Sequence, residues 1–204
     1  MASMIYPKTK SKLEKIRNRV FFRPADAKIL GLTFQDIQHL LKNGAVERVS
    51  RGLYRVSSAE PTEMETIAMV AAAAPKTIIC LLSALRVHDI GTQLPHAVWI
   101  ALNRKSRKPT LLPSQVRIVR FSGPMLTHGV IQRTMMGVEV SVTSPARTVV
   151  DCFRYRQKIG LAVALEALRD AIRSRKATVD EIMRTAKICR IRTVIIPYVE
   201  ALSS

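Results

Sequence analysis

The sequence is poor in the residues on which disulfides, metal sites and membrane spans depend. It has three cysteines, which stand far apart and outside any Cys-x-x-Cys pattern: Cys80, Cys152 and Cys189. This spacing predicts buried thiols in a reducing compartment and argues against a disulfide framework. The four histidines lack metal-ligand spacing. The longest apolar stretch, residues 66–75, is too short to cross a bilayer, and the N-terminus has no signal-peptide run, so we expect a cytoplasmic protein.

Motifs of common enzyme classes are also missing from the sequence. It contains no Gly-rich phosphate loop, no His-Glu-x-x-His pair and no Gly-x-Ser-x-Gly elbow. A metal-dependent nuclease needs several carboxylates to hold its cation. Asp89, Glu139 and Asp151 fall near expected strand ends or helix starts, but no lysine-bearing motif accompanies them. We therefore expect no catalytic residues, no cofactor and no bound metal.

Positive charge is abundant instead. The chain has 33 Lys and Arg against 15 Asp and Glu, a net charge of +18, while 48% of its residues are hydrophobic. It is therefore globular, and its charge favours nucleic acid, an anionic membrane surface or an acidic protein as partner. The first sixty residues hold 12 Lys and Arg against 5 Asp and Glu, a surplus of 7 out of 18, so both parts of the chain are basic.

The N-terminal part predicts three short helices. Residues 10–22 carry apolar side chains at spacings of three and four, which is typical of a helix. Residues 24–30 open with a proline and are followed by a glycine, as helices often are. After a tight turn, Thr33 and Asp36 form a capping box for a helix that ends at residue 43. Two short helices joined in this way are typical of a helix-turn-helix.

The last of these helices has two different faces. One is apolar and expected to pack into the core: Phe34, Ile37, Leu40 and Leu41. The other is polar and expected to contact DNA: Gln35, Gln38, His39 and Lys42. Glutamine amides can pair with adenine edges, and lysine can reach guanine or phosphate. Any solvated helix shows a polar face, so the segments beside this one decide between the two interpretations.

Residues 44–57, GAVERVSRGLYRVS, predict a β-hairpin with cations crowded at its tip. Gly52 can supply the positive φ of a tight turn. We expect DNA contacts from four hairpin residues: Arg48, Ser50, Arg51 and Arg55. Protection of a sheet edge would account for one arginine, whereas three beside a helix-turn-helix indicate a wing lying along DNA. Residues 1–58 are thus predicted to form a winged helix DNA-binding domain.

A polar, proline-containing stretch at 57–63 marks the expected boundary to a second domain, residues 62–204. Strand-like runs lie at 76–82, 96–102, 114–121 and 137–143. Helical patterns lie at 62–75, 83–91, 144–155, 159–177 and 178–188. We therefore expect an α+β protein, with an N-terminal winged helix-turn-helix followed by a larger mixed α+β domain with a small sheet and C-terminal helices.

Two further features of the second domain are predicted: the residues that cap its helices and one buried apolar stripe. Ser83 should cap the helix at 83–91, Ser144 the helix at 144–155, and Thr178 with Glu181 the helix at 178–188. The helix at 159–177 should bury one stripe of side chains: Leu161, Leu165, Leu168 and Ile172.

Residues 103–109, NRKSRKP, form a second basic patch in a loop between two expected strands. Like charges so close together repel each other unless a polyanion or an acidic surface approaches. We expect this loop to contact DNA or an acidic partner through four residues: Arg104, Lys105, Arg107 and Lys108.

Four segments, in this order and spacing, resemble the AbiEi family of antitoxins and transcriptional regulators of type IV toxin–antitoxin (abortive infection) systems. They are RVSRGLYRV, SALRVHDIGTQLP, WIALNRKSRKP and SPARTVVDCF, and the likeness extends from about residue 10 to about residue 175. Arg86 and Arg147 fall within these motifs. Arg147 stands one helical turn before Asp151, so the two can form a salt bridge.

The resemblance implies a winged helix that binds inverted repeats in its own promoter and represses its operon, with self-association on the DNA as a compatible arrangement. It also implies a second domain that counteracts a nucleotidyltransferase-like toxin without a stable complex. The residues themselves leave two alternatives open. One is a metal-dependent nuclease guided by a winged helix, and the other is a plain transcription factor whose second domain oligomerises or senses a ligand.

Overall fold

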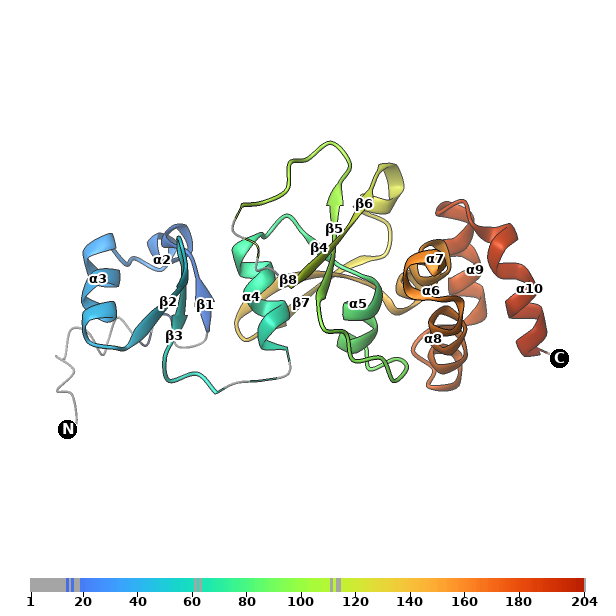
Figure 1. Ribbon diagram of the computed structural model, residues 1–204, viewed down its shortest axis with the longest axis horizontal. Helices are drawn as coiled ribbons and strands as arrows, with labels where there is room; N and C mark the ends of the chain where they lie inside the picture. Colours follow the sequence, from blue (N-terminus) through green and yellow to red (C-terminus); the bar gives the residue numbers. More distant parts are fainter. Residues whose placement is uncertain are drawn as a thin grey trace. The chain divides into compact units, whose positions relative to one another are not determined.

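The computed structural model describes residues 14, 16, 19–60, 62, 64–110, 112 and 115–203 (Figure 1). The chain falls into two compact units. Unit 1 comprises residues 1–75, 109–112 and 133–140, and unit 2 comprises residues 76–108, 113–132 and 141–204. The boundary expected between residues 58 and 62 stays a prediction, and unit 1 as defined here extends beyond it to residue 75.

Unit 1 contains the two helices of the expected helix-turn-helix. Helix α2 (Pro24–Ile29) begins with its proline in the first turn, and the Asp26 carboxylate accepts a hydrogen bond from the Arg23 backbone N–H at 2.9 Å. Helix α3 (Phe34–Lys42) begins with the expected capping box, in which Asp36 N–H donates to Thr33 Oγ1 and Thr33 N–H donates to the Asp36 carboxylate. These reciprocal bonds satisfy backbone donors that a helix start otherwise leaves unpaired. The helix expected over residues 10–22 lies largely outside the described residues.

A three-stranded antiparallel sheet completes the winged helix. Its strands are β1 (Phe21–Phe22), β2 (Val46–Ser50) and β3 (Leu53–Val56), in the order β1-β3-β2. Phe21–Phe22 therefore forms a strand, although the sequence pattern placed these residues at the end of a helix. The turn between β2 and β3 contains Gly52 at φ +73°, which confirms the positive φ expected there. Ile37 and Leu40 of α3 are buried in one core with Phe22, Tyr54 and other residues of this sheet. Helix α4 (Glu65–Ala73) lies against β1.

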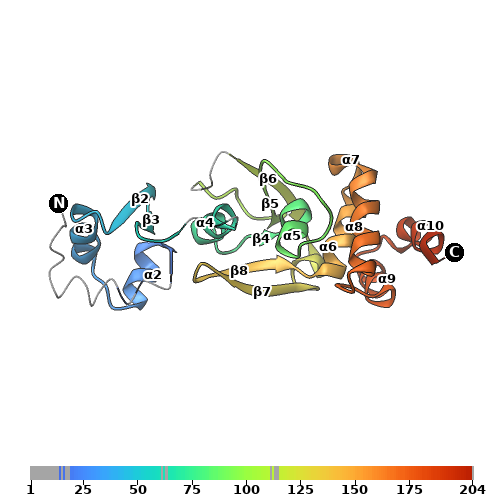
Figure 2. The ribbon, with the colours of Figure 1, turned by 90° about the horizontal axis from the view of Figure 1, so that it is seen from below.

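The second sheet has five strands in the order β6-β5-β4-β8-β7 (Figure 2). They are β4 (Ile78–Ile79), β5 (Val98–Asn103), β6 (Val116–Phe121), β7 (Val130–Met135) and β8 (Val138–Thr143). Strands β5, β6 and β8 lie where the sequence predicted them. Strand β7 was not predicted, because its alternation of polar and apolar residues is weak and only two residues separate it from β8. Residues 133–140, at the tip of this hairpin, belong to unit 1.

Helices α5 (Leu81–Val87), α6 (Pro145–Arg154), α7 (Arg156–Ile159), α8 (Leu161–Arg173), α9 (Val179–Ile188) and α10 (Arg192–Ser203) supply the rest of unit 2, with a 3-10 turn at Gly123–Leu126. Ser144 caps α6 and Thr178 with Glu181 caps α9, as expected. Ser83 does not cap α5, because the run 76–82 is strand for two residues only and the helix already begins at Leu81. The Ser83 hydroxyl instead accepts a hydrogen bond from Trp99 N–H.

The face that α8 buries differs from the expected leucine stripe. Leu161 is 39% exposed, and Leu165 and Ile172 are only half-buried. The buried residues are Ala164, Ala167, Leu168 and Ala171. Small side chains let α8 approach α6 closely. Alanines therefore line most of the buried face of α8, where leucines were expected. Figure 2 shows α8 beside α6 at one end of the sheet.

A buried ion pair lies at the centre of unit 2. Arg147 and Asp151, both on α6 and both 0% exposed, form the expected salt bridge with Nε 2.9 Å from Oδ1. The other guanidinium nitrogens donate to the carbonyls of His128 and Met125, at 2.5 Å and 3.1 Å, and the guanidinium carbon lies 4.8 Å from the centre of the Phe121 ring. Arg147 thereby joins α6 to the segment between β6 and β7.

Gly129 shows how closely this segment packs on Arg147. It has φ +64°, and a Cβ atom at this position would come within 2.8 Å of the Arg147 Cβ. A side chain here would meet both backbone strain and a clash. The segment can therefore approach α6 closely only because residue 129 is glycine.

We expect Asp151→Ala to destabilise unit 2 by about 1–3 kcal/mol at neutral pH, because it leaves the buried Nε–H of Arg147 without its acceptor. Burial raises the pKa of Asp151 from 3.8 to about 6, against the lowering influence of Arg147. Because the folded-state pKa is the higher one, the folded protein binds the proton more tightly than the unfolded chain does. The stability that this group contributes is therefore greatest at low pH and falls as the pH rises through about 6. Urea unfolding from about pH 4 to about pH 7 measures the free energy of unfolding of the natural protein and of the variant. A difference between the two proteins that grows with pH would contradict the raised pKa.

Candidate nucleic-acid interface

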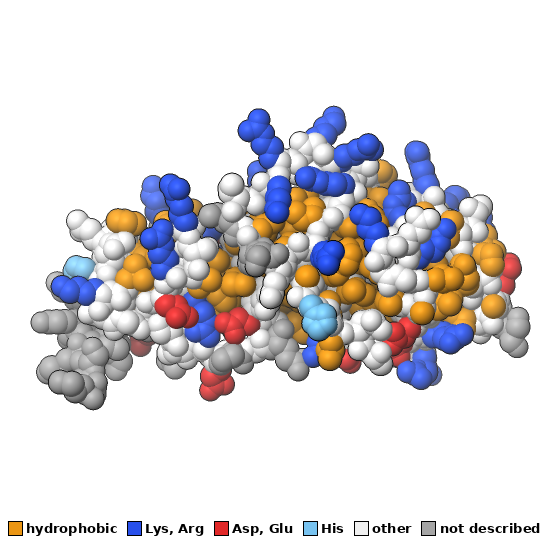
Figure 3. All heavy atoms as spheres, in the orientation of Figure 1, with side chains coloured by type: hydrophobic (Ala, Val, Ile, Leu, Met, Phe, Trp, Pro, Cys, Tyr) orange, Lys and Arg blue, Asp and Glu red, His pale blue; other side chains and the backbone are white. Residues whose placement is uncertain are grey.

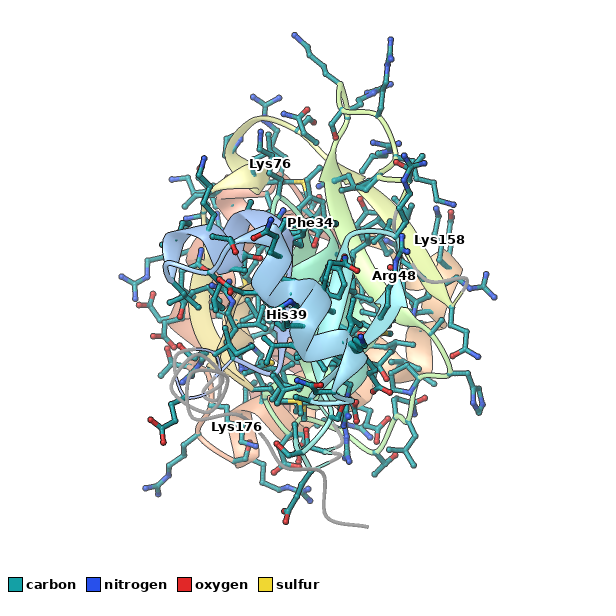
Figure 4. The ribbon with its side chains drawn as sticks, turned by 90° about the vertical axis from the view of Figure 1, so that its left-hand side faces the viewer. Phe34, His39, Arg48, Lys76, Lys158 and Lys176 are labelled. Atoms are coloured by element: carbon teal, nitrogen blue, oxygen red, sulfur yellow. The ribbon has the colours of Figure 1, made fainter. Side chains whose placement is uncertain are left out.

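The polar face of α3 is open to solvent along its whole length. Gln35, Gln38, His39 and Lys42 are all exposed, while Ile37 and Leu40 on the opposite face are each 1% exposed. Figure 4 looks onto this helix, with His39 midway along it and Arg48 on the adjacent hairpin. Amide, imidazole and ammonium groups thus project together from one helix whose other face is fixed in a core. Such a helix can enter the major groove without disturbing its own packing.

Phe34 is the one residue of the expected apolar face that the core does not take up. Its side chain is 63% exposed, although the spacing of the four apolar residues placed it with Ile37 and Leu40. The reason is its position as the first residue of α3, one turn before the buried part of the helix begins. An exposed phenylalanine in the first turn of this helix, beside Gln35 and one turn from Gln38, is a candidate contact residue that periodicity alone assigned to the core.

The wing presents two exposed cations near its tip. Arg48 is exposed on β2, where its Nε donates to the Ser50 carbonyl at 3.4 Å, and Arg51 is exposed in the turn that follows. Ser50 is half-buried, and its hydroxyl oxygen has no hydrogen-bond partner among the described residues. Figure 3 shows Lys and Arg side chains above this hairpin, with Asp and Glu side chains below it.

Arg55 has a different environment from Arg48 and Arg51. Its side chain is 13% exposed and lies between two carboxylates, Glu47 at 3.2 Å and Glu65 at 2.8 Å. It also donates to the Ala59 carbonyl at 2.8 Å. Two acceptors of opposite charge compensate its guanidinium, so it ties the hairpin to the following segment and to α4. DNA contact by Arg55 stays a prediction, and the structure gives this residue a stabilising role within unit 1.

The second basic patch lies in unit 2, in the loop between the parallel strands β5 and β6. Its four cations are all exposed: Arg104, Lys105, Arg107 and Lys108. The start of the loop is ordered by hydrogen bonds from Lys105 N–H to the Asn103 side chain at 2.9 Å and from the Arg120 guanidinium to the carbonyls of Asn103 and Ser106. Arg120 thus holds a turn that displays the other cations.

The carboxylates considered for a nuclease each have partners of their own. Asp151 pairs with Arg147, Glu139 accepts from the Thr134 hydroxyl at 2.7 Å, and Lys176 bonds to Asp89. Within the described ranges, no group of three or more His, Cys, Asp or Glu side chains is arranged to hold a metal ion.

The three cysteines are free and buried, as the sequence predicted. Burial raises the pKa of each thiol. Among the helices that the structure describes, none is long and apolar enough to span a membrane.

These observations define unit 1 as a winged helix-turn-helix, a class of DNA-binding fold. Residues 13–57 match a family model described as "Transcriptional regulator, AbiEi antitoxin". The resemblance to the AbiEi family is thereby confirmed over this segment. A comparison with curated protein sequences gives no match.

Three chains of solved structures are similar to this protein. One is the crystal structure of the RV2827C protein from Mycobacterium tuberculosis, with a TM-score of 0.58 and 15% identity, over 89% of this chain and 72% of that one. At this identity the likeness concerns the fold, and it extends across both units.

Proposed function

We propose that this protein is a DNA-binding transcriptional autorepressor and antitoxin. The observation that carries the proposal is the exposed polar face of α3 beside two exposed wing cations, on a segment that matches AbiEi regulators. Unit 1 would bind inverted repeats in the protein's own promoter. Two copies can bind such repeats side by side, since a repeated half-site offers each copy the same surface.

The parts of unit 1 would divide the work of recognition. With α3 in the major groove, the amides of Gln35 and Gln38 can pair with adenine edges, and Lys42 can reach guanine or a phosphate. His39 adds a further hydrogen-bonding group on the same face. Arg48 and Arg51 would neutralise phosphates beside the groove, which supports binding to any sequence and sets the register. The exposed loop at 104–108 offers a second set of cations to DNA or to an acidic partner.

Phe34 would add apolar recognition to this polar face. The major groove presents the C5 methyl group of thymine, which phenylalanine can contact. The first turn of a recognition helix is the part that reaches base edges in helix-turn-helix proteins. An exposed ring at this position therefore fits a thymine next to the bases that Gln35 and Gln38 would read.

We assign the antitoxin role to unit 2, acting in the cytoplasm on a nucleotidyltransferase-like toxin without a stable complex. The family description that matches residues 13–57 names both regulation and antitoxin action. We also propose that the chain has no catalytic activity of its own and acts without a cofactor.

A gel-shift assay with DNA from upstream of the gene should show preference over random DNA, and the affinity should fall steeply with salt. Arg48→Ala and Arg51→Ala should each weaken binding to all sequences and reduce the salt slope by about 1, whereas Gln38→Ala should change preference at one base pair. Arg55→Ala tests stability and not DNA contact. It should lower the free energy of unfolding by about 1–3 kcal/mol, because it leaves Glu47 and Glu65 without their cation. Equal affinity for upstream and random DNA would overturn the DNA-binding proposal.

The thymine contact can be tested by removing one methyl group from the DNA. Replacing single thymines of the bound site by deoxyuridine should weaken binding of the natural protein at one position by roughly 1 kcal/mol, about five-fold. Phe34→Ala should bind the thymine site as weakly as the natural protein binds the deoxyuridine site, and should be indifferent to the replacement. If Phe34→Ala and deoxyuridine weaken binding additively at every thymine, Phe34 does not contact a methyl group.

Co-expression tests the antitoxin role separately. Expressed from an unrelated promoter, the protein should restore growth to cells that produce the nucleotidyltransferase-like product of the adjacent gene. Arg51→Ala should restore growth equally well, because the wing belongs to unit 1 and the Arg51 side chain is exposed. Intact operator binding without rescue would indicate a plain transcription factor.

A further inference from the structure

A cleft of defined chemistry lies within unit 2, away from the basic loop. It has a volume of about 630 Å³ and forms where the beginnings of β5 and β6 meet the segment 93–97, α5 and α7. Sites for small molecules in proteins span about 300–1,000 Å³ and combine apolar walls with a few polar groups. Figure 3 shows hydrophobic side chains open to solvent in this part of unit 2, with Lys and Arg side chains around them.

The apolar part of the cleft is formed around Trp99, the only tryptophan in the sequence. The indole is half-buried against the core, with Leu94, which is 70% exposed, and Ile118 lining the same cleft. The Trp99 backbone is fixed on both sides, since its N–H donates to the Ser83 hydroxyl at 2.9 Å and its carbonyl accepts from Cys80 N–H at 3.1 Å. The backbone at Trp99 is therefore fixed, and the indole packs against the core.

The charged part of the cleft is entirely cationic. Arg117 stands directly beside Trp99 in the parallel register of β5 and β6, so their side chains leave the sheet on the same face. Lys158 of α7 adds a second cation and His96 an imidazole, and no Asp or Glu is among the described residues that line the cleft. Among the described residues, neither Arg117 nor Lys158 forms an ion pair. Two permanent charges thus border an aromatic wall without an anion to compensate them.

The rim opposite the sheet is held by a helix outside the cleft. Glu166 on α8 accepts hydrogen bonds from Thr92 N–H at 2.8 Å and from the Gln93 side chain at 3.1 Å. Asp170, one turn further along α8, accepts from Gly91 N–H at 2.8 Å. These carboxylates are occupied by the loop that they anchor, and they do not line the cleft. Anchoring the rim in advance reduces the ordering cost of binding.

We propose that this cleft binds a nucleotide, with the base against Trp99 and Leu94 and the phosphate between Arg117 and Lys158. A planar ring suits an indole wall, because bases stack on aromatic side chains. A phosphate suits two uncompensated cations, one of which is an arginine able to form two parallel hydrogen bonds. Inorganic phosphate would leave the apolar wall unused, and a neutral ring would leave the cations unused. The nucleotide is a free mononucleotide or the 5′-terminal nucleotide of a strand, which share this chemistry.

The single tryptophan reports on the site directly. AMP added to the full-length protein should change the Trp99 fluorescence and saturate. Adenosine and inorganic phosphate should each bind about ten-fold more weakly or worse, since each lacks one half of the recognised chemistry. Competition by a short 5′-phosphorylated oligonucleotide, compared with the same oligonucleotide without its phosphate, decides whether the occupant is a strand end or the free nucleotide.

Arg117→Ala and Lys158→Ala should each weaken AMP binding by about ten-fold, as expected for the loss of a charge-assisted hydrogen bond. Both residues are exposed, and an unchanged urea unfolding midpoint confirms that each variant is folded. Lys105→Ala, which removes an exposed cation from the loop at 104–108, is the matched control and should bind AMP like the natural protein. An AMP signal that does not saturate, equal binding of inorganic phosphate, or Arg117 and Lys158 variants that bind normally would each overturn the proposal. No outcome depends on DNA binding by unit 1.

Discussion

The structure of unit 2 depends on one buried charge pair. Arg147 and Asp151 are removed from water completely, so the guanidinium must find its partners within the protein. It does so with the carboxylate one turn away, two backbone carbonyls from the segment after β6, and the face of Phe121. These partners come from different parts of the chain, and they fix α6 against the edge of the sheet. The same arrangement brings Gly129 so close to Arg147 that a Cβ atom at residue 129 would lie 2.8 Å from the Arg147 Cβ.

The same principle distinguishes the arginines of unit 1. Arg55 is bound by two carboxylates and a carbonyl, so its charge is neutralised within unit 1. Arg48 and Arg51 form no ion pair with a carboxylate among the described residues, so their charge remains available to an anion outside the protein. A net charge of +18 therefore overstates what any partner meets. What matters for binding is which cations lack an internal anion, and the wing tip, the loop at 104–108 and the cleft beside Trp99 each present such cations.

Much of the fold followed from local signals. The capping boxes at Thr33 and Thr178 and the Ser144 cap begin helices where they were expected, because a cap depends on residues only three positions apart. The α+β class, the winged helix and three strands of the larger sheet followed in the same way. Strand β7, the short β4 and the early start of α5 did not. The limits of β4 depend on pairing with β5 and the distant β8, and β7 is a strand because it pairs with β8 across a two-residue turn; periodicity within one segment does not report such pairing.

The candidate functional residues show the same difference between local relations, which the sequence predicts, and tertiary surroundings, which it does not. The sequence by itself determined that α3 carries a polar face, that the hairpin turns at Gly52 and that Arg147 stands one turn from Asp151, since spacing along a helix or a turn settles such relations. Only the tertiary structure decided that Phe34 lies outside the core, that Arg55 is neutralised by Glu47 and Glu65, and that Trp99 and Arg117 stand side by side. Exposure and charge compensation depend on what the rest of the chain places around a residue, and residues far apart in sequence provide those surroundings.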